Sequence, residues 1–348
     1  MRDDGDHGSG RDGVIVSASI ALDIIMSFGG SFQEHILPEK VHVLSVSFLL
    51  DGLRRHRGGV GGNIAYSLAL LGERPVLVGG VGSDFAEYRQ VFDDLGVDMR
   101  MVQEDPAVLT ASAFMMADLS GNQIASFYPG PSGIVLDAPV REAARSSRYG
   151  IVGATSPDVM RRHAAEIAAG GTRLFYDPSQ QIVVMPPEDI LAGIEPAWGV
   201  VLNDYELGML ERKTGLGLDA LRERVPLVGV TFGSEGSELH HGGETVRIPI
   251  AASDEVVDPT GGGDAYRSGL LKGLLLGLDL PVAGRIAALA ATYAIERHGP
   301  QEHAYTADAF VARFDGAFPD MVGAVHPAMF ATPVATGSLA GGELAAPV

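Results

Sequence analysis

The sequence predicts a doubly wound α/β fold, in which helices flank a mostly parallel sheet and a small second β-sheet is inserted as a lid. Three observations support this prediction. After residue 149, short apolar runs of strand length alternate with helical stretches, which is the pattern of a parallel sheet. Over residues 24–57 that alternation is absent. Finally, three consecutive glycines, Gly261–Gly263, lead directly into an apolar helix.

The composition limits what the chain can be. Its 348 residues, 46% of them hydrophobic, allow one large α/β domain or two smaller ones with an ample core. A net charge of −19 makes the protein as a whole repel nucleic acid and anionic membranes, so any phosphate site must be local. The absence of cysteine excludes disulfides, cysteine-ligated zinc and thiol catalysis.

Neither end of the chain resembles a folded element. Residues 1–12 are acidic and glycine-rich, unlike a signal peptide, and are expected to be a disordered tail. Residues 320–348 lack periodicity and are expected to be a second one. No apolar run reaches membrane-spanning length, so a soluble cytoplasmic protein is expected.

The first strand is expected at Val14–Val16, continuing through Ser19 to Asp23 at its C-terminal end. Ligands collect at that edge of an open parallel sheet, which makes Asp23 a candidate binding residue. The alternative is a solvated loop carboxylate.

The lid is expected from two segments, residues 24–57 and 108–128. In the first, Ile24–Phe28 and Val41–Leu50 have strand character. In the second, Val108–Met116 and Gln123–Tyr128 flank a Gly-Asn turn. This second pair contains Phe114 and Phe127, and aromatic residues so placed are more often core than ligand contacts.

A glycine-rich segment, His56–Asn63, precedes a helix that ends near Gly72. It does not match the dinucleotide fingerprint Gly-x-Gly-x-x-Gly, because Ile64 stands where the third glycine is required. Gly59 instead lets a ligand approach the backbone, and Asn63 offers a donor and an acceptor.

Two further elements follow strands of the regular half. Asn203-Asp204-Tyr205-Glu206 reads as a capping box, yet the same amide and carboxylate are suited to holding the waters of Mg²⁺. Thr231, Gly233 and Gly236 form a glycine turn before a predicted hairpin, which alone is weak evidence for a site.

The segment Asp258–Gly269 is the most informative. The amides of Gly261, Gly262 and Gly263 are expected at a helix N-terminus, where an anion or a γ-phosphoryl group fits. Asp264 would repel such a ligand, so it is either a simple N-cap or a group that accepts a proton.

Four elements in this order resemble the ribokinase-like carbohydrate and nucleoside kinases over residues 13–319. They are Gly-Gly-x-x-x-Asn, Asn-x-x-Glu, Thr-x-Gly-x-x-Gly and Asp-Pro-Thr-Gly-Gly-Gly-Asp. Longer strings are similar to bacterial, actinobacterial-type adenosine kinases: Gly30–Phe32, Leu37–Glu39, His56–Val60, Ile124–Gly130 and Asp177–Gln181. The resemblance implies a ribokinase-like fold and a kinase that converts adenosine and ATP to AMP and ADP, a purine-salvage reaction.

The resemblance also implies roles for individual residues. Asp264 would be the catalytic base beside the Gly261–Gly263 anion hole. Asp23, Gly59 and Asn63 would bind the ribose, whereas the adenine would be bordered by Ser19, Phe114, Phe127, Gln180 and Gln181. ATP would contact Asn203, Thr231, Gly233 and Gly236, with Mg²⁺ held through water by Asn203 and Glu206. A K⁺ site near Asp254–Val257 is left open.

Three alternatives stay open. The nearest is a kinase of the same fold that acts on another nucleoside or on a free sugar such as ribose or fructose. A nucleoside-binding regulator without turnover is a second, and a dehydrogenase is the weakest because the fingerprint fails. The exposed lid sheet also suggests a homodimer formed through the lid.

Overall fold

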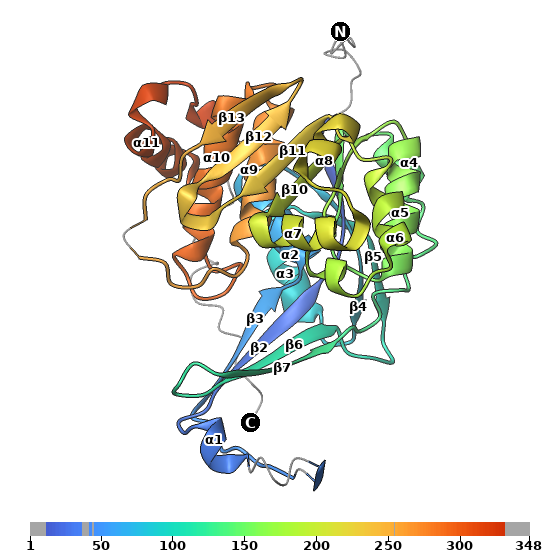
Figure 1. The fold of residues 1–348 in the computed structure, drawn as a ribbon, viewed down its shortest axis with the longest axis vertical. Coiled ribbons are helices and arrows are strands. Elements are labelled where there is room, and N and C mark those ends of the chain that lie inside the picture. The colour runs from blue at the N-terminus through green and yellow to red at the C-terminus, as the bar shows by residue number, and fades with distance from the viewer. Residues whose placement is uncertain (1–11, 37–41, 44, 254, 331–348) are drawn as a thin grey trace.

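A computed structural model describes residues 12–36, 42–43, 45–253 and 255–330. They form a nine-stranded sheet covered by helices on both faces and a separate four-stranded sheet that projects from it (Figure 1). The doubly wound architecture with a small second sheet is therefore confirmed.

The large sheet has the strand order β13-β12-β11-β10-β9-β8-β1-β4-β5. It is parallel except at one edge, where β12 and β13 form an antiparallel hairpin on β11. The strands are β1 (Val14–Ser17), β4 (Val76–Gly82), β5 (Asp98–Asp105), β8 (Tyr149–Val152), β9 (Arg173–Tyr176), β10 (Gly199–Asn203), β11 (Leu227–Thr231), β12 (Ser237–His241) and β13 (Glu244–Ile248).

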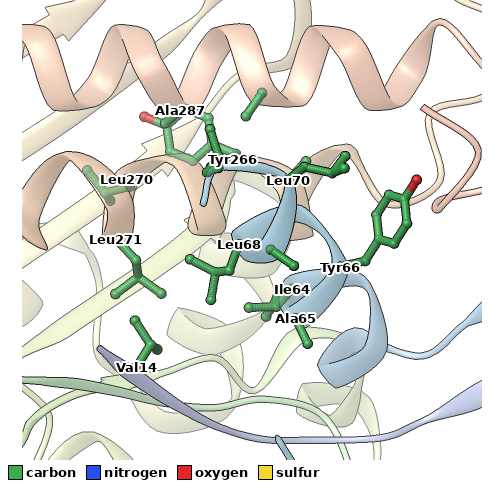
Figure 2. Close-up of a cluster of buried hydrophobic side chains, with 14 of the residues drawn as sticks. Val14, Ile64, Ala65, Tyr66, Leu68, Leu70, Tyr266, Leu270, Leu271 and Ala287 are labelled. Carbon is green, nitrogen blue, oxygen red and sulfur yellow. The ribbon is translucent and has the colours of Figure 1, made fainter. Parts of the chain in front are cut away.

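Helices cover both faces because the strands between them are apolar on both sides. One hydrophobic cluster joins the sheet to α2 (Val60–Leu70), α3 (Ala86–Leu95), α9 (Gly262–Leu275), α10 (Leu280–Ile295) and α11 (Ala307–Ala317). The other joins it to α4 (Val140–Ala144), α5 (Pro157–Ala169), α6 (Pro187–Ile194), α7 (Asp204–Thr214) and α8 (Leu218–Arg224). Figure 2 shows the packing of α2 against α9 in the first cluster, with Leu68 near Leu271 and Val14 below them.

The small sheet has the order β3-β2-β6-β7, built from β2 (Ala21–Ser27), β3 (Gly52–Gly58), β6 (Ala111–Ala117) and β7 (Gln123–Tyr128). Its strands extend away from the large sheet toward the short helix α1 (Phe32–His35) (Figure 1). Its two halves come from the two segments predicted for the lid.

Two strand predictions in this region are wrong. The first strand stops at Ser17, so Asp23 lies on β2 of the small sheet and not at the end of β1. The partner of β2 is Gly52–Gly58 and not Val41–Leu50. The apolar residues of 45–50 suggested a strand, but Phe48 packs its ring on Phe28 and Phe32 and lies outside any strand. The strand β3 is instead rich in arginine, which gave it no apolar pattern.

The C-terminal prediction is also corrected in part. Phe330 is buried, its ring 5.1 Å from that of Phe310, and Val325 is buried too. Residues 320–330 are therefore part of the folded unit, because these apolar side chains cover α11. The remaining tail expectations, residues 1–11 and 331–348, fall outside the described residues.

Across the described ranges, none of the helices combines the length and the apolar character needed to cross a bilayer.

Candidate functional site

The turn before α9 places Asp264 beside a helix N-terminus. Gly261 is the N-cap, with φ +81°, a left-handed conformation that glycine adopts without strain. A Cβ at this position would lie 2.4 Å from Cβ of Pro300, so the turn also requires the absence of a side chain. Asp264 is the third residue of the helix, and therefore the interpretation of Asp264 as the N-cap is wrong.

The amides of the first helical turn point outward from this N-terminus, where they can meet an anion. They are not equivalent, however. The Gly262 amide donates a long hydrogen bond of 3.2 Å to the Pro259 carbonyl. The three glycine amides predicted as an anion hole are thus brought together, with that of Gly262 already partly engaged by the turn.

The Asp264 carboxylate lies in an environment suited to holding or accepting a proton. Burial raises its pKa to about 6, opposed by the Arg267 guanidinium and by a hydrogen bond from Asn63. Asn63 Nδ2 donates to Asp264 Oδ2 at 2.8 Å. A base whose pKa is close to neutral is matched to proton transfer at physiological pH.

A second carboxylate, the half-buried Asp23, lies on β2. Burial raises its pKa to about 6, an effect that His56 opposes and that Asp264 and Asp258 reinforce. The Asp23 carboxylate lies against Gly58, where an added Cβ would be 2.3 Å from Asp23 Oδ2 and would displace the carboxylate. Asp23 and Asp264 are therefore close enough for the charge of Asp264 to raise the pKa of Asp23.

Gly59, the N-cap of α2, packs against the backbone of residues 19–21, where the chain passes from β1 into β2. Its φ is +82°, and a Cβ would lie 2.5 Å from the Ala21 amide nitrogen. The next residue, Val60, donates its amide to Ser19 Oγ at 3.2 Å. The predicted sugar residues Gly59 and Asn63 thus open helix α2 directly beside Ser19.

Ser19 also lines a cavity of about 480 Å³. Four of the residues predicted to border a base line it: Ser19, Phe127, Gln180 and Gln181. Main-chain and small polar groups from residues 129–133 and 154–157 complete the wall. Its volume is within the range of pockets that bind molecules of nucleoside size.

Phe114 does not belong to this cavity. Phe127 pairs with Ala113 across β6 and β7, and successive residues of a strand point to opposite faces. Phe114 therefore projects from the other face of the small sheet, beside Ile24 of β2. The structure therefore does not bring Phe114 together with the other predicted base contacts, because the alternation of a strand cannot be assigned to a face before its partners are known.

Asn203 and Glu206 form the predicted capping box at the start of α7. Asn203 Oδ1 accepts from the Glu206 amide at 2.7 Å, and Glu206 Oε2 accepts from the Asn203 amide at 2.9 Å. Asn203 lies opposite Thr231 of β11, which leads into the turn where Gly233 and Gly236 have φ of +57° and +89°. Asn203, Thr231 and the turn with Gly233 and Gly236 therefore lie at the same edge of the sheet, where β10 and β11 end.

The described residues contain no group of three or more histidine or acidic side chains that could hold a metal directly. Glu206 nevertheless fits a site bridged by water, because its carboxylate has lone pairs beyond the capping bond and raises the pKa of nearby Asp264. Mg²⁺ commonly retains several waters and uses few protein ligands.

Sequence reasoning missed Arg267, which lies one turn after Asp264 and is buried. Its Nε is 2.8 Å from Asp177 Oδ2, its Nη2 donates to the Val201 carbonyl at 2.9 Å, and Nη2 is 3.7 Å from Glu206. The available signal was a charged residue, Arg267, one turn after Asp264 on a helix that is mostly buried. Through Asp177 it anchors the chain that turns into Gln180 and Gln181, where Ser179 has φ +47°.

Comparisons with known proteins identify the family to which the chain is similar. Residues 25–307 match the model of the pfkB family carbohydrate kinases. A nucleoside kinase of Methanothermobacter thermautotrophicus is 31% identical over 274 residues, covering 78% of this chain and 88% of the relative. A probable fructokinase-3 of Arabidopsis thaliana is 28% identical, covering 72% and 77% of the two chains.

Among solved structures, a nucleoside kinase of Burkholderia thailandensis in complex with inosine is similar, with a TM-score of 0.80 and 35% identity over 88% of this chain and 99% of that one. The same kinase has been solved in complex with ADP-inosine, with a TM-score of 0.77 and 37% identity over 88% and 96% of the chains.

Proposed function

This chain belongs to the pfkB family of carbohydrate kinases, and from that premise we propose that it transfers the γ-phosphoryl group of ATP to the 5′-hydroxyl of a purine nucleoside, with adenosine as the first candidate. The observation that carries the proposal is the junction of two sites. A cavity of about 480 Å³ is lined by the Phe127 ring, the amides of Gln180 and Gln181, and Ser19. The Ser19 hydroxyl accepts the Val60 amide at the start of α2, the helix whose Asn63 donates to Asp264. A free sugar would leave the cavity largely empty.

The residues divide the nucleoside between them. Phe127 offers a ring face on which a purine stacks, while Gln180 and Gln181 offer donors and acceptors to its edge. An ionised Asp23 accepts hydrogen bonds from the ribose hydroxyls beside Gly59 and Asn63. The 5′-hydroxyl then points toward Asp264.

In the reaction, Asp264 takes the proton of the 5′-hydroxyl as that oxygen attacks the γ-phosphorus in line. The first-turn amides of α9 donate to the oxygens of the transferring group, which they can do without rearrangement. When bound, Mg²⁺ would neutralise phosphate charge, and Asn203 and Glu206 would hold its waters. Thr231, Gly233 and Gly236 would contact the nucleotide along the same sheet edge.

A K⁺ site near Asp254–Val257 stays a proposal, because Asp254 lies outside the described residues. The small sheet is proposed as the lid that excludes water from the transfer, since water would otherwise compete for ATP.

The identity of the base is the open choice. Glutamine amides can donate or accept, so Gln180 and Gln181 suit either adenosine or inosine. The kinase from Burkholderia thailandensis binds inosine. The match to a probable fructokinase supports a free sugar as the second candidate, in which case the cavity would be peripheral to the reaction.

The test is ADP release from the full chain with adenosine, inosine, guanosine, cytidine, ribose and fructose in turn, alongside Asp264→Asn. We expect a purine nucleoside to give the highest kcat/KM, and Asp264→Asn to lower kcat by about 10²- to 10⁴-fold. Nucleoside binding should be nearly intact in the variant.

Three results would contradict the proposal. Turnover of fructose or ribose above all nucleosides would assign the chain to the sugar kinases. Full activity of Asp264→Asn would remove the assigned base, and binding of nucleosides without any ADP release would favour a regulator.

A further inference from the structure

The orientation of the Asn63 amide determines whether a hydrogen-bond donor or an acceptor lies against the Asp264 carboxylate. An asparagine amide has a donor end and an acceptor end of nearly the same shape. With Nδ2 toward Asp264 Oδ2, as here, the contact stabilises the ionised carboxylate. With the amide reversed, a carbonyl oxygen would face the carboxylate and favour its protonated form. Something must therefore hold the amide in one direction.

Gln301 and Tyr88 supply that direction. Gln301 Nε2 donates to Asn63 Oδ1 at 2.9 Å and to the Tyr88 hydroxyl at 2.5 Å. The Tyr88 hydroxyl in turn donates to the Gly58 carbonyl at 2.9 Å. All three side chains are buried.

The donor and acceptor in each of these hydrogen bonds are fixed by the last acceptor, the Gly58 carbonyl. The Gly58 carbonyl can only accept, so Tyr88 must donate to it and accept from Gln301. The Gln301 atom that contacts Tyr88 is then its nitrogen, and the same nitrogen contacts Asn63. Asn63 must therefore present its oxygen to Gln301 and its N–H to Asp264.

The surrounding backbone is built to admit these contacts. Gly62 lies where a Cβ would be 2.1 Å from the Tyr88 hydroxyl and 3.2 Å from Gln301 Nε2. Arg57, whose guanidinium pairs with Glu302 at 2.9 Å, also donates to the Gln301 carbonyl at 3.4 Å. Gln301 thus contacts Arg57 through its main chain and Asn63 through its side chain.

The arrangement has a cost. Gln301 Oε1 is buried and has no hydrogen-bond partner within the described part of the chain. Buried polar atoms are ordinarily paired, and leaving one unpaired lowers stability. The amide nonetheless keeps its nitrogen toward Asn63 and Tyr88, which points to a role in the site more than in the fold.

We propose that Gln301 is a positioning residue for the phosphoryl transfer: it holds the amide of Asn63 so that an N–H group faces Asp264. The inference rests on the proposed role of Asp264 as the base. The charged groups that interact with Asp264 are left unchanged in the test. They are Arg267 of α9, Glu206 of α7, Asp23 of β2, and Asp177 of the loop after β9.

The experiment measures kcat/KM for the preferred nucleoside against pH in the full-length enzyme. Gln301→Met removes the donor at similar size, whereas Gln301→Glu offers Asn63 an acceptor and so turns its amide around. Because the Asn63 hydrogen bond lowers the pKa of Asp264, its loss should move the acidic limb of the profile upward by about one pH unit. Gln301→Glu should move it further than Gln301→Met, and both defects should shrink as the pH rises.

Thr172→Val is the matched control, because it removes one buried hydroxyl that donates to main-chain carbonyls away from the site. It should leave the limb in place at comparable loss of stability. Should a Gln301 variant not fold, Tyr88→Phe removes the contact that sets the direction of the amide and should move the limb the same way by a smaller amount.

An acidic limb that stays at the wild-type pH in the folded variants would overturn the positioning role. That result can be separated from failure of the proposed function, because in the first case Asp264→Asn still lowers kcat by about 10²- to 10⁴-fold, whereas in the second it does not.

Discussion

At the scale of single residues, the site combines two carboxylates that burial makes difficult to ionise. Asp23 and Asp264 each have a pKa raised to about 6, mainly by burial, and Asp264 contributes to the shift of Asp23. In the proposed reaction both would lose a proton, Asp23 to accept the ribose hydroxyls and Asp264 to accept the 5′-proton. Burial of these two carboxyls therefore lowers the stability of the folded protein near neutral pH, where the proposed reaction needs both of them ionised.

This leads to a prediction about stability and pH. A carboxyl whose pKa rises from 3.8 to about 6 on folding holds its proton more tightly in the folded state, so its stabilising contribution is present below pH 4 and is lost as the pH rises through 6. Asp264→Asn removes this loss, and we expect it to raise the free energy of unfolding by roughly 1–3 kcal/mol at pH 8 and hardly at all at pH 4.

Urea denaturation of both proteins at the two pH values measures the difference. Asp219→Asn, at an exposed site, controls for the loss of one negative charge. An equal effect of Asp264→Asn at both pH values would show that burial of Asp264 does not raise its pKa.

At the scale of elements, the turn into α9 makes the site possible. It packs Gly261 against Pro300 of the loop after α10, and Arg267 one turn after Asp264 ties the same helix to Asp177. The helix packs extensively on α2 and α10, so the position of Asp264 is set by the core (Figure 2).

Gly261→Ala and Gly277→Ala form a matched pair at the two ends of α9. Both glycines have positive φ, +81° and +70°, but a Cβ at Gly277 meets nothing within 4 Å whereas one at Gly261 meets Pro300. We expect Gly277→Ala to cost about 1 kcal/mol of stability with kcat unchanged. Gly261→Ala should cost roughly 2–3 kcal/mol and lower kcat at least 10-fold, since the amides and Asp264 must move.

Chemical denaturation and steady-state kinetics of the two variants provide the comparison. Equal loss of kcat in both would show that the contact with Pro300 does not position the site.

At the scale of the whole molecule, the small sheet has one face toward the site and one face away from it. The register places Phe114 on the outer face with Ile24, Met26, Met116, Leu53 and Ile124. Leu53 is 50% exposed and Ile124 41%. An apolar sheet face of this kind commonly marks an interface between proteins.

We expect two copies to associate through this outer face. The mass in solution should then be twice 36.4 kDa, and Ile124→Glu should yield a monomer, because a charge would be buried in the contact. Val322→Glu, at an exposed apolar position of the main unit, should leave the mass unchanged. Light scattering of the three proteins decides the matter, and a wild-type monomer would end the hypothesis.

Some features could be predicted from residue order because they depend on local chemistry. The alternation after residue 149 predicted the parallel sheet, since strands buried on both faces are apolar and short. The capping box at Asn203 and Glu206 was predicted because its hydrogen bonds span only three residues. The glycine turn before Asp264 was predicted for the same reason.

Other features were decided only by tertiary structure. Which face Phe114 occupies, where the strand around Arg55 begins, and whether Asp264 caps its helix or faces Asn63 all depend on partners distant in sequence. Gln301 is 37 residues after Asp264 and 238 after Asn63, so no local pattern marks it. The sequence thus determined the elements and the chemistry at their ends, whereas long-range packing decided which side chains meet and what proton affinity they have.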